Sequence, residues 1–235
     1  MVTKAPDEPE EDTTITTLTA LHRDVHSLLA IYKKTHFLTF VRATAPTLIA
    51  DFVMGKHIEI ICNELQNFIT KKNQRLMVFL SPRSTKSVIC SKLFPAWYIG
   101  NKPNHEVMAV SHSDQLSSDF GRTVRDIVDT GNFRESFPGV KLNRDARAAG
   151  KWRTNLNGSY YAAGIRSAIA GRGAHVAILD DVMSEDDAFS EAGRRYAKEW
   201  WPAGLRTRIM PGGNIIIINT RYHHDDICGW LLSQQ

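Results

Sequence analysis

A lysine and a serine stand side by side at Lys86 and Ser87, where a tight loop is expected to meet the start of a helix. A lysine in such a place can bring a positive charge to the terminal phosphates of a nucleotide, and the adjacent hydroxyl can ligate magnesium. The amides and the dipole of a helix start also favour an anion. We therefore predict a phosphate-binding loop for a nucleoside triphosphate and Mg²⁺. The loop comprises Ser81, Pro82, Arg83, Ser84, Thr85, Lys86 and Ser87.

This loop departs from the general pattern G-x-x-x-x-G-K-[ST] at both glycines, where the chain has Leu80 and Thr85. Glycine before the lysine allows close backbone approach and a positive φ, which a β-branched residue resists. The loop alone therefore leaves two interpretations open, a nucleotide site and a strand–turn–helix without a ligand. If it binds nucleotide, we expect binding through Lys86 and the backbone amides, with slow or altered turnover.

Two consecutive carboxylates, Asp180 and Asp181, follow the apolar run of residues 176–179. Carboxylates at the carboxyl end of a buried parallel strand lie where open α/β sheets bind ligands. One can hold magnesium through its water, and the next can orient the attacking water. The alternative is that both aspartates cap the following segment. Paired with the Lys-Ser loop the motif is more specific, because both halves are needed to hold magnesium on a triphosphate.

A third polar group, Asn219-Thr220-Arg221, follows the apolar residues 215–218. At the tip of a strand beside the nucleotide strand, Thr220 and Arg221 could sense the γ-phosphate; the alternative is ordinary hydrogen bonding within a loop. The histidines and aspartates of residues 223–226 do not indicate a metal site. The aspartates fit a helix start, and the spacing matches no standard zinc pattern.

Apolar runs bounded by turns predict the buried strands that position these groups. The expected strands are residues 76–80, 106–111, 175–179 and 214–219, with a hairpin at 152–162 around Asn157-Gly158. Helical spacing predicts helices over residues 18–32, 56–70, 113–129 and 186–201, after the phosphate-binding loop, and from residue 225. Residues 35–53 are expected to be irregular and broken at Pro46. Strands alternating with helices predict an α/β fold with a mostly parallel sheet covered by helices on both faces.

The composition is that of an ordered globular protein. The chain has 235 residues, 43% hydrophobic and 23% charged, with five tryptophans, which argues against a disordered chain. A net charge of +4 permits a polyanionic partner. Three widely spaced cysteines, Cys62, Cys90 and Cys228, suit reduced thiols better than a disulfide framework. No apolar run has the length of a membrane span.

Three sections are expected along the chain. Residues 1–17 are acidic and polar and predict a flexible tail. Residues 18–55 form a helical and then irregular lead-in. Residues 56–235 form one ATPase domain.

Several separated blocks make the chain resemble the ATPase part of the large terminase subunit of tailed bacteriophages. The blocks are RLMVFLSPRSTKS, FPAWYIG, VSHSDQLSSDFGRTVRDIV, AGRGAHVAILDDV and PGGNIIIINTRYHHDD, within residues 52–232. The resemblance implies a P-loop NTPase fold of the ASCE-like kind and a motor that hydrolyses ATP to drive double-stranded DNA into a procapsid. The family also has a C-terminal nuclease domain. Since the chain ends at Gln235, where that domain would begin, we expect the motor domain alone, without nuclease activity.

The resemblance also implies partners and a location. The expected partners are double-stranded DNA, the small terminase subunit, the portal protein and further copies in a homo-oligomeric ring, without a membrane. The expected location is the host cell cytoplasm during virion assembly.

Roles for the nucleotide site carry over by position. Lys86 resembles the phosphate lysine and Ser87 the magnesium hydroxyl. Asp180 matches the acidic residue that stabilises magnesium. Arg83 matches an arginine that faces the γ-phosphate. We expect Lys86 and the carboxylates to converge on one metal–triphosphate from two adjoining strands.

The resemblance also implies a catalytic base, for which two residues are candidates, and a coupling segment. The catalytic base is Asp181 or Glu185, because the family often has glutamate where Asp181 stands. Thr220 and Arg221 match the segment that couples hydrolysis to movement.

Adenine contacts and an arginine finger are implied at positions outside the three motifs. Phe52 and His57 fall where the family contacts adenine. Arg166 and Arg172 are candidates for an arginine finger supplied to a neighbouring subunit, with solvated loop cations as the alternative.

A basic stretch suits contact with the DNA backbone. It consists of Lys141, Arg144, Arg147, Lys151 and Arg153, and a solvated basic loop is the alternative reading. Two rival functions are a helicase-like or repair NTPase and an inactive P-loop domain that serves as a DNA-binding or assembly module.

Overall fold

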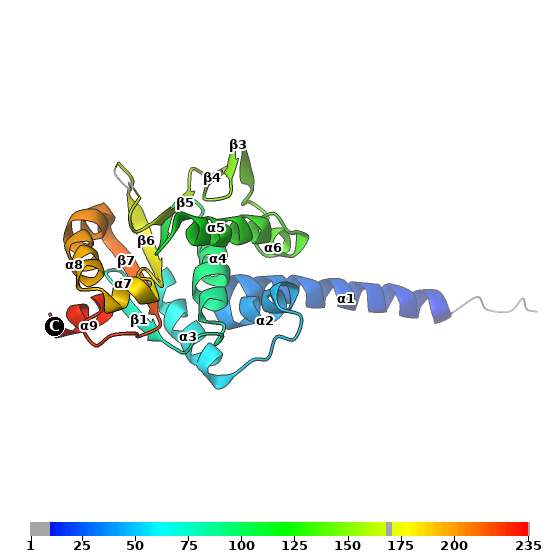
Figure 1. The fold of residues 1–235 in the computed structure, drawn as a ribbon. Helices are drawn as coiled ribbons and strands as arrows, with labels where there is room; N and C mark the ends of the chain where they lie inside the picture. Colours follow the sequence, from blue (N-terminus) through cyan, green and yellow to red (C-terminus); the bar gives the residue numbers. More distant parts are fainter. Residues whose placement is uncertain (1–9, 168–170, 235) are drawn as a thin grey trace, which may run out of the picture.

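The computed structural model describes residues 10–167 and 171–234, without the side chains of residues 10–14, 144 and 146. Seven strands form one sheet in the order β1-β7-β6-β2-β5-β4-β3, and helices lie on both faces, so the fold is α/β (Figure 1). The strands are β1 (Arg75–Phe79), β2 (Glu106–Ser111), β3 (Leu142–Ala148), β4 (Lys151–Thr154), β5 (Ser159–Gly164), β6 (Ala174–Asp180) and β7 (Ile209–Asn219).

The sheet is mixed, whereas a mostly parallel sheet was expected. Five neighbouring strands of the sheet pair in parallel, namely β1, β7, β6, β2 and β5. β4 and β3 then extend the sheet with two antiparallel pairings. β4 and β5 form the predicted hairpin, in which Asn157 has a φ of 69°. β3 was not predicted, because its sequence is polar and basic and has no run of apolar residues.

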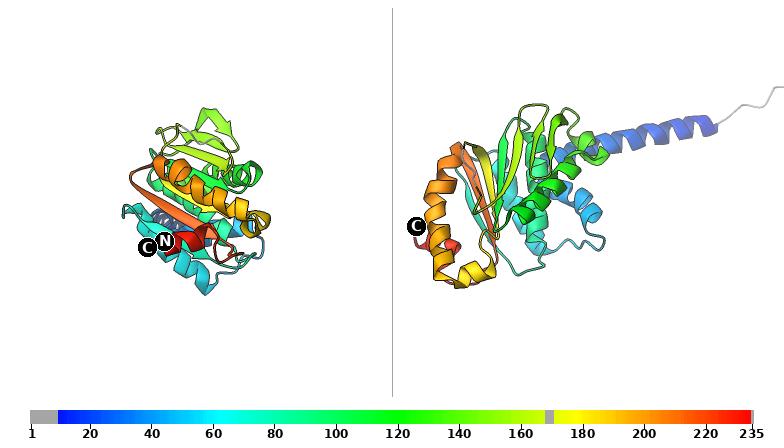
Figure 2. Two further views of the ribbon diagram at one scale, coloured as in Figure 1. Left: turned by 60° about the vertical axis from the view of Figure 1, so that its left-hand side comes forward. Right: turned by 45° about the horizontal axis from the view of Figure 1, so that its top comes forward.

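Alternating side chains of the parallel strands supply two cores. In β7, Ile216 and Ile218 face the first core, while Ile215 and Ile217 face the second. This period of two is what a strand buried on both faces requires. Figure 2 shows the two layers of helices on either side of the sheet.

Helices of the first half of the chain cover the first core. They are α2 (Phe37–Leu48), α3 (Lys56–Gln66) with the short η1 (Asn67–Ile69), the π-helical η2 (Val88–Leu93), α4 (Phe94–Asn101), α5 (Asp114–Val128) and α6 (Gly131–Ser136). The first helix, α1 (Glu10–Thr35), lies against α2, α4 and α6 outside this core. Helices of the second half cover the second core. They are α7 (Glu185–Phe189), α8 (Glu191–Trp200), η3 (Trp201–Leu205) and α9 (Ile227–Ser233). The short η4 (Arg206–Arg208) joins η3 to β7.

The first fifty residues are more helical than predicted. The expected tail of residues 1–17 enters helix α1 at Glu10, and residues 1–9 lie outside the described part. The expected irregular stretch of residues 35–53 contains helix α2, which includes Pro46. A proline so close to a helix end removes only one hydrogen bond, and the amide of Ile49 still reaches the carbonyl of Ala45 at 3.0 Å.

All five parallel strands end at one edge of the sheet, which brings their following loops together. β7 lies between β1 and β6, so the loop after β1 and the carboxylates after β6 do not come from adjoining strands as expected. Thr220 does follow the strand beside β1, as predicted. This edge is called the carboxyl edge below.

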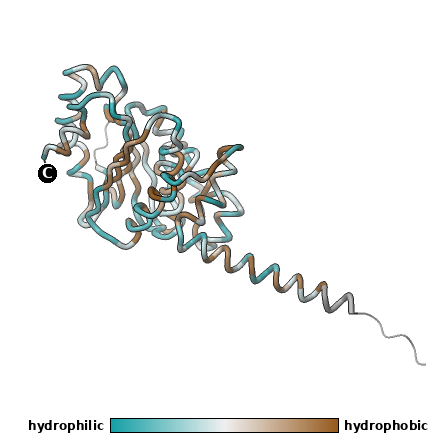
Figure 3. The backbone as a smooth tube through the Cα atoms, turned by 90° about the horizontal axis from the view of Figure 1, so that it is seen from below, coloured by the Kyte–Doolittle hydropathy of each residue, from teal (hydrophilic) through white to brown (hydrophobic). Residues whose placement is uncertain are grey.

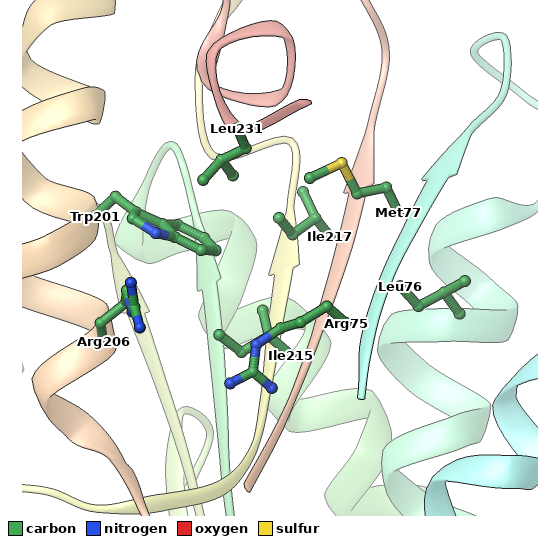
Figure 4. Close-up of a pocket in the computed structure, with 8 residues that line it drawn as sticks. All are labelled: Arg75, Leu76, Met77, Trp201, Arg206, Ile215, Ile217 and Leu231. Atoms are coloured by element: carbon green, nitrogen blue, oxygen red, sulfur yellow. The ribbon is translucent and has the colours of Figure 1, made fainter. Parts of the chain in front are cut away.

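A hollow of about 250 Å³ lies beside β1 on the face of the second core (Figure 4). Its lining residues are Arg75, Leu76, Met77, Trp201, Arg206, Ile215, Ile217 and Leu231, none of which is a predicted site residue. The three cysteines are buried and unpaired. Within residues 10–167 and 171–234, no helix combines the length and the apolar character that crossing a membrane requires.

Candidate nucleotide site

The predicted phosphate-binding loop joins β1 to a helix that begins at Lys86 and continues through η2 and α4. Its backbone is unusual, because Arg83 and Thr85 both have a φ of 63°. The hydroxyl of Thr85 donates a hydrogen bond of 2.6 Å to the carbonyl of Ser84. Thr85 therefore holds the left-handed conformation for which the general pattern uses glycine.

Lys86 points into the carboxyl edge and is 6% exposed. Its Nζ donates to Thr220 Oγ1 at 2.8 Å and lies 3.5 Å from Asp181 Oδ2. The lysine thus joins the loop after β1 to the segments that follow β7 and β6. A buried ammonium needs such partners, since water cannot solvate it.

Asp180, the last residue of β6, is 2% exposed and is held by two serines. Its Oδ1 accepts from Ser87 Oγ at 3.1 Å and its Oδ2 from Ser91 Oγ at 2.6 Å. Burial raises the pKa of this carboxyl from its ordinary 3.8 to about 6, the two serine hydrogen bonds lower it, and Asp181 raises it. Ser91 was not predicted, although it follows Ser87 by four residues and so shares its helix face.

Asp181 locks three strand ends together. Its Oδ1 accepts from the amide of Thr220 at 2.8 Å, and its own amide donates to the carbonyl of Ile218 at 2.9 Å. Its carbonyl accepts from the amide of His112, just after β2, at 3.1 Å. A φ of 44° at Asp181 turns the chain sharply enough for these contacts. His112 Nδ1 also lies 3.1 Å from this carbonyl, a contact that no motif in the sequence indicated.

The residues present fit a magnesium ion carried by a nucleotide. Asp180 and Ser87 offer hard oxygen ligands side by side, and burial raises the pKa of Asp180 although the Lys86 ammonium lies near enough to lower it. The Ser84 hydroxyl in the loop is buried without a hydrogen-bond partner in the described part. No group of three or more His, Cys, Asp or Glu side chains that could hold a metal ion occurs among the described residues. Magnesium here would therefore need further oxygens from phosphate and water.

Arg221 lies at the margin of the site. Its Nε donates to Asp226 Oδ2 at 2.7 Å, and its guanidinium lies 5.3 Å from the centre of the Phe79 ring. Asp226 is the N-cap of α9 through Gly229, as the sequence suggested. Arg221 therefore links the end of β1 to the start of α9.

Other predicted residues lie around the loop without entering this cluster. Ser81, Pro82 and Arg83 are exposed. His57 Nε2 lies 3.2 Å from the carbonyl of Ser84, which places His57 beside the phosphate-binding loop. Phe52 packs against the first core.

Glu185 and the candidate arginine fingers are not brought together with Lys86. Glu185 is exposed in the first turn of α7. Arg166 follows β5 at the carboxyl edge, where Nη2 donates to Asp187 Oδ1 at 2.8 Å. Arg172 precedes β6, at the opposite edge of the sheet, and stacks 4.1 Å from the Tyr161 ring centre. Within one chain Arg172 cannot reach the nucleotide site.

The candidate DNA-contact residues lie on or next to the antiparallel strands at the far side of the sheet from β1. Lys141 precedes β3, Arg147 is in β3, and Lys151 and Arg153 are in β4. All four are exposed, and Arg147 lies 3.9 Å from Asp129. Arg144 is also in β3, but its side chain lies outside the described part. These residues form a basic ribbon apart from the nucleotide site.

The raised pKa of Asp180 predicts pH-dependent stability of the ligand-free protein. Between pH 3.8 and about 6 the folded state binds a proton that the unfolded state has lost, so the free energy of unfolding falls as pH rises through this window. Two pKa units correspond to about 3 kcal/mol. Denaturant unfolding from pH 4 to 7 should show this fall for wild type and a smaller fall for Asp180→Asn. Equal slopes for both proteins would contradict the assignment.

The left-handed backbone at Thr85 predicts that substitution by glycine raises stability and improves nucleotide binding or turnover. Thr85→Gly should raise the free energy of unfolding by about 1 kcal/mol, because the strain of a β-branched residue at positive φ disappears. It should also tighten nucleotide binding or speed turnover. The matched control is Ser84→Gly, since Ser84 does not have a positive φ. The prediction is contradicted if Thr85→Gly shows no higher stability, no tighter nucleotide binding and no faster turnover than this control.

No model of a known protein family matches this chain, and no curated protein matches it. The function is therefore inferred from the motifs and from the contacts described above.

Proposed function

We propose that this chain is a Mg²⁺-dependent ATPase whose nucleotide site is the cluster at the carboxyl edge. The observation that carries the proposal is the meeting of three separate motifs. Lys86 contacts both Thr220 and Asp181, while Ser87 contacts Asp180. A phosphate lysine, a magnesium hydroxyl and two carboxylates within a few ångströms are the parts that phosphoryl transfer requires.

Each side chain then has a defined task. Ser87 and Asp180 would hold Mg²⁺, which when bound neutralises charge on the phosphate oxygens. Lys86 places its ammonium against the terminal phosphates, with Arg83 on the solvent side of the loop. Asp181 accepts a hydrogen bond from the attacking water and orients it, and Glu185 is the alternative base. Most of the catalysis is positioning and charge stabilisation.

The contact between Lys86 and Thr220 supports a route from hydrolysis to movement. Without a ligand the lysine donates to the Thr220 hydroxyl at 2.8 Å. A terminal phosphate competes for the same ammonium and frees Thr220, which starts the segment joining β7 to α9. Phosphate release restores the contact. Arg221 extends this segment to Asp226 at the N-cap of α9.

We further propose that the hydrolysis drives double-stranded DNA in the manner of a phage packaging motor with a P-loop NTPase fold. The ordered sequence blocks and the placement of the phosphate-binding loop at the carboxyl edge of parallel strands support this proposal. The basic ribbon of β3 and β4 would contact the phosphate backbone, which gives affinity without sequence preference. The small terminase subunit, the portal protein and a ring of copies in the host cytoplasm are the partners and place that this function requires.

The test is ATP hydrolysis by wild type with Mg²⁺ or with EDTA, each with and without double-stranded DNA. We expect hydrolysis that needs Mg²⁺, rises with DNA and loses the DNA effect as salt increases. The second candidate is an inactive DNA-binding or assembly module, which the Thr85 departure favours. DNA binding without any nucleotide binding or hydrolysis would support that module and contradict the motor.

A further inference from the structure

Helix α1 projects from the body of the protein (Figures 1 and 3). Its 26 residues span about 39 Å at the rise of an α-helix. Its last turns are anchored to the body by hydrogen bonds. Trp97 Nε1 donates to the carbonyl of Lys33 at 2.9 Å, and Asn101 Nδ2 donates to the carbonyl of Lys34 at 3.1 Å.

The exposed side of α1 carries an apolar seam with heptad spacing. The seam residues alternate by three and four positions, and each is more than half exposed. They are Leu18 (59%), Leu21 (58%), Val25 (53%), Leu28 (58%) and Tyr32 (55%). Lys33, which is 4% exposed, lies on the side that packs against the body. The seam therefore faces away from the body and is open along its whole length.

The sequence of α1 also needs a packing partner to be stable as a helix. Five of the seven residues 13–19 are threonine, a poor helix former. An isolated helix is marginal in water even with good helix formers, and most helical stability in proteins comes from packing of an apolar face. A seam with a 3.5-residue period fits another helix, because the side chains of one seam fill the holes of the other.

We infer that the seam pairs with α1 of a second copy of this chain, in an antiparallel coiled coil. The seam is self-complementary in one register: Leu18 faces Leu28 of the second copy, and Leu21 faces Val25 of the second copy. The ends have opposite charge, with acidic residues at the start of α1 and the exposed Lys34 in its last turn. An antiparallel pair places these ends beside each other and opposes the two helix dipoles, whereas a parallel pair brings the acidic starts together.

The oligomeric state of the whole chain tests this inference, by sedimentation over a range of concentrations. We expect dimers, and for Leu21→Glu/Leu28→Glu a dissociation constant raised by more than about 100-fold, since two apolar layers are lost on each copy. The control Ala20→Glu adds one glutamate on an exposed position outside the seam and should leave the dimer intact. Circular dichroism checks that all variants remain folded. A monomeric wild type, or a dimer that survives the double substitution, would overturn the inference.

Cysteine pairing tests the orientation separately. In the antiparallel register, a mixture of Leu18→Cys and Leu28→Cys proteins should form the mixed disulfide on oxidation, and each protein alone should not. The native cysteines do not compete, because all three are buried. Preferential pairing of Leu18→Cys with itself would indicate parallel helices and contradict the antiparallel arrangement. Neither experiment uses the nucleotide site, so their failure would leave the proposed ATPase untouched.

Discussion

Lys86→Ala should reduce the ATPase rate by about 100-fold or more, the usual effect of removing one preorganised group that stabilises transferring charge. The lysine is 6% exposed and reaches both Thr220 and Asp181, so its ammonium is fixed before a nucleotide arrives. The rate is measured at saturating Mg²⁺·ATP, with and without DNA. Thermal unfolding should show a folded variant, because the Thr220 amide still holds Asp181 at 2.8 Å.

The matched control for this substitution is Lys92→Ala, which removes a lysine from the same helix. Lys92 Nζ lies 5.8 Å from the centre of the Phe120 ring, which is not a residue of the candidate site. We expect this variant to retain most of the wild-type rate. If Lys86→Ala hydrolyses ATP as fast as Lys92→Ala, the site assignment is wrong.

Asp180→Asn should also lower the ATPase rate by about 100-fold or more, because a neutral amide cannot balance the charge of Mg²⁺ beside Ser87. The same change should stabilise the ligand-free protein near pH 7, since it removes a buried charge whose pKa is about 6. Opposite effects on rate and stability distinguish a functional carboxylate from one that supports the fold. The rate is measured across Mg²⁺ concentrations and the stability by denaturant unfolding.

Asp126→Asn serves as the control for Asp180→Asn. Asp126 is a carboxylate whose side chain is 59% exposed, and it pairs with the neighbouring Arg125. We expect neither its rate nor its stability to change measurably. An Asp180→Asn protein that loses stability at pH 7 and keeps its rate would show a structural role instead.

The sequence predicted elements best where one local signal decides the structure. The apolar residues 106–111 form β2 as predicted, because an uninterrupted apolar run suits a strand buried on both faces. The predicted helix over residues 113–129 is α5, and Ser113 caps it by accepting a 3.3 Å hydrogen bond from the amide of Leu116. The predicted helix over residues 186–201 divides at Ser190, which caps α8. Caps and apolar runs involve residues that are close together in the chain, so they can be recognised from a single sequence.

Pairings between distant segments could not be predicted from these signals. The insertion of β7 between β1 and β6 depends on which strands pack together, and no local pattern encodes strand order. Strand β3 has the composition of a basic loop and is held by its pairing with β4. Helix α1 begins earlier than its apolar periodicity indicated.

The candidate site shows the same division. Lys86, Ser87, Asp180 and Thr220 carry recognisable side-chain chemistry at strand ends, so their types and positions marked them. Their neighbour Ser91 contributes from the same helix face as Ser87, and His112 contributes its backbone amide and its ring Nδ1, both 3.1 Å from the Asp181 carbonyl. Neither a shared helix face nor a contact with a backbone carbonyl can be recognised from the residue type alone.

A double-mutant cycle tests whether Lys86 and Asp180 act on one metal–triphosphate. The affinity for a non-hydrolysable ATP analogue with Mg²⁺ is measured by calorimetry for wild type, Lys86→Ala, Asp180→Asn and the double variant. Groups that share a ligand give losses that fail to add, and we expect a coupling energy above about 1 kcal/mol. Losses that add to within about 0.5 kcal/mol would mean that the two residues serve separate sites, and would contradict the account.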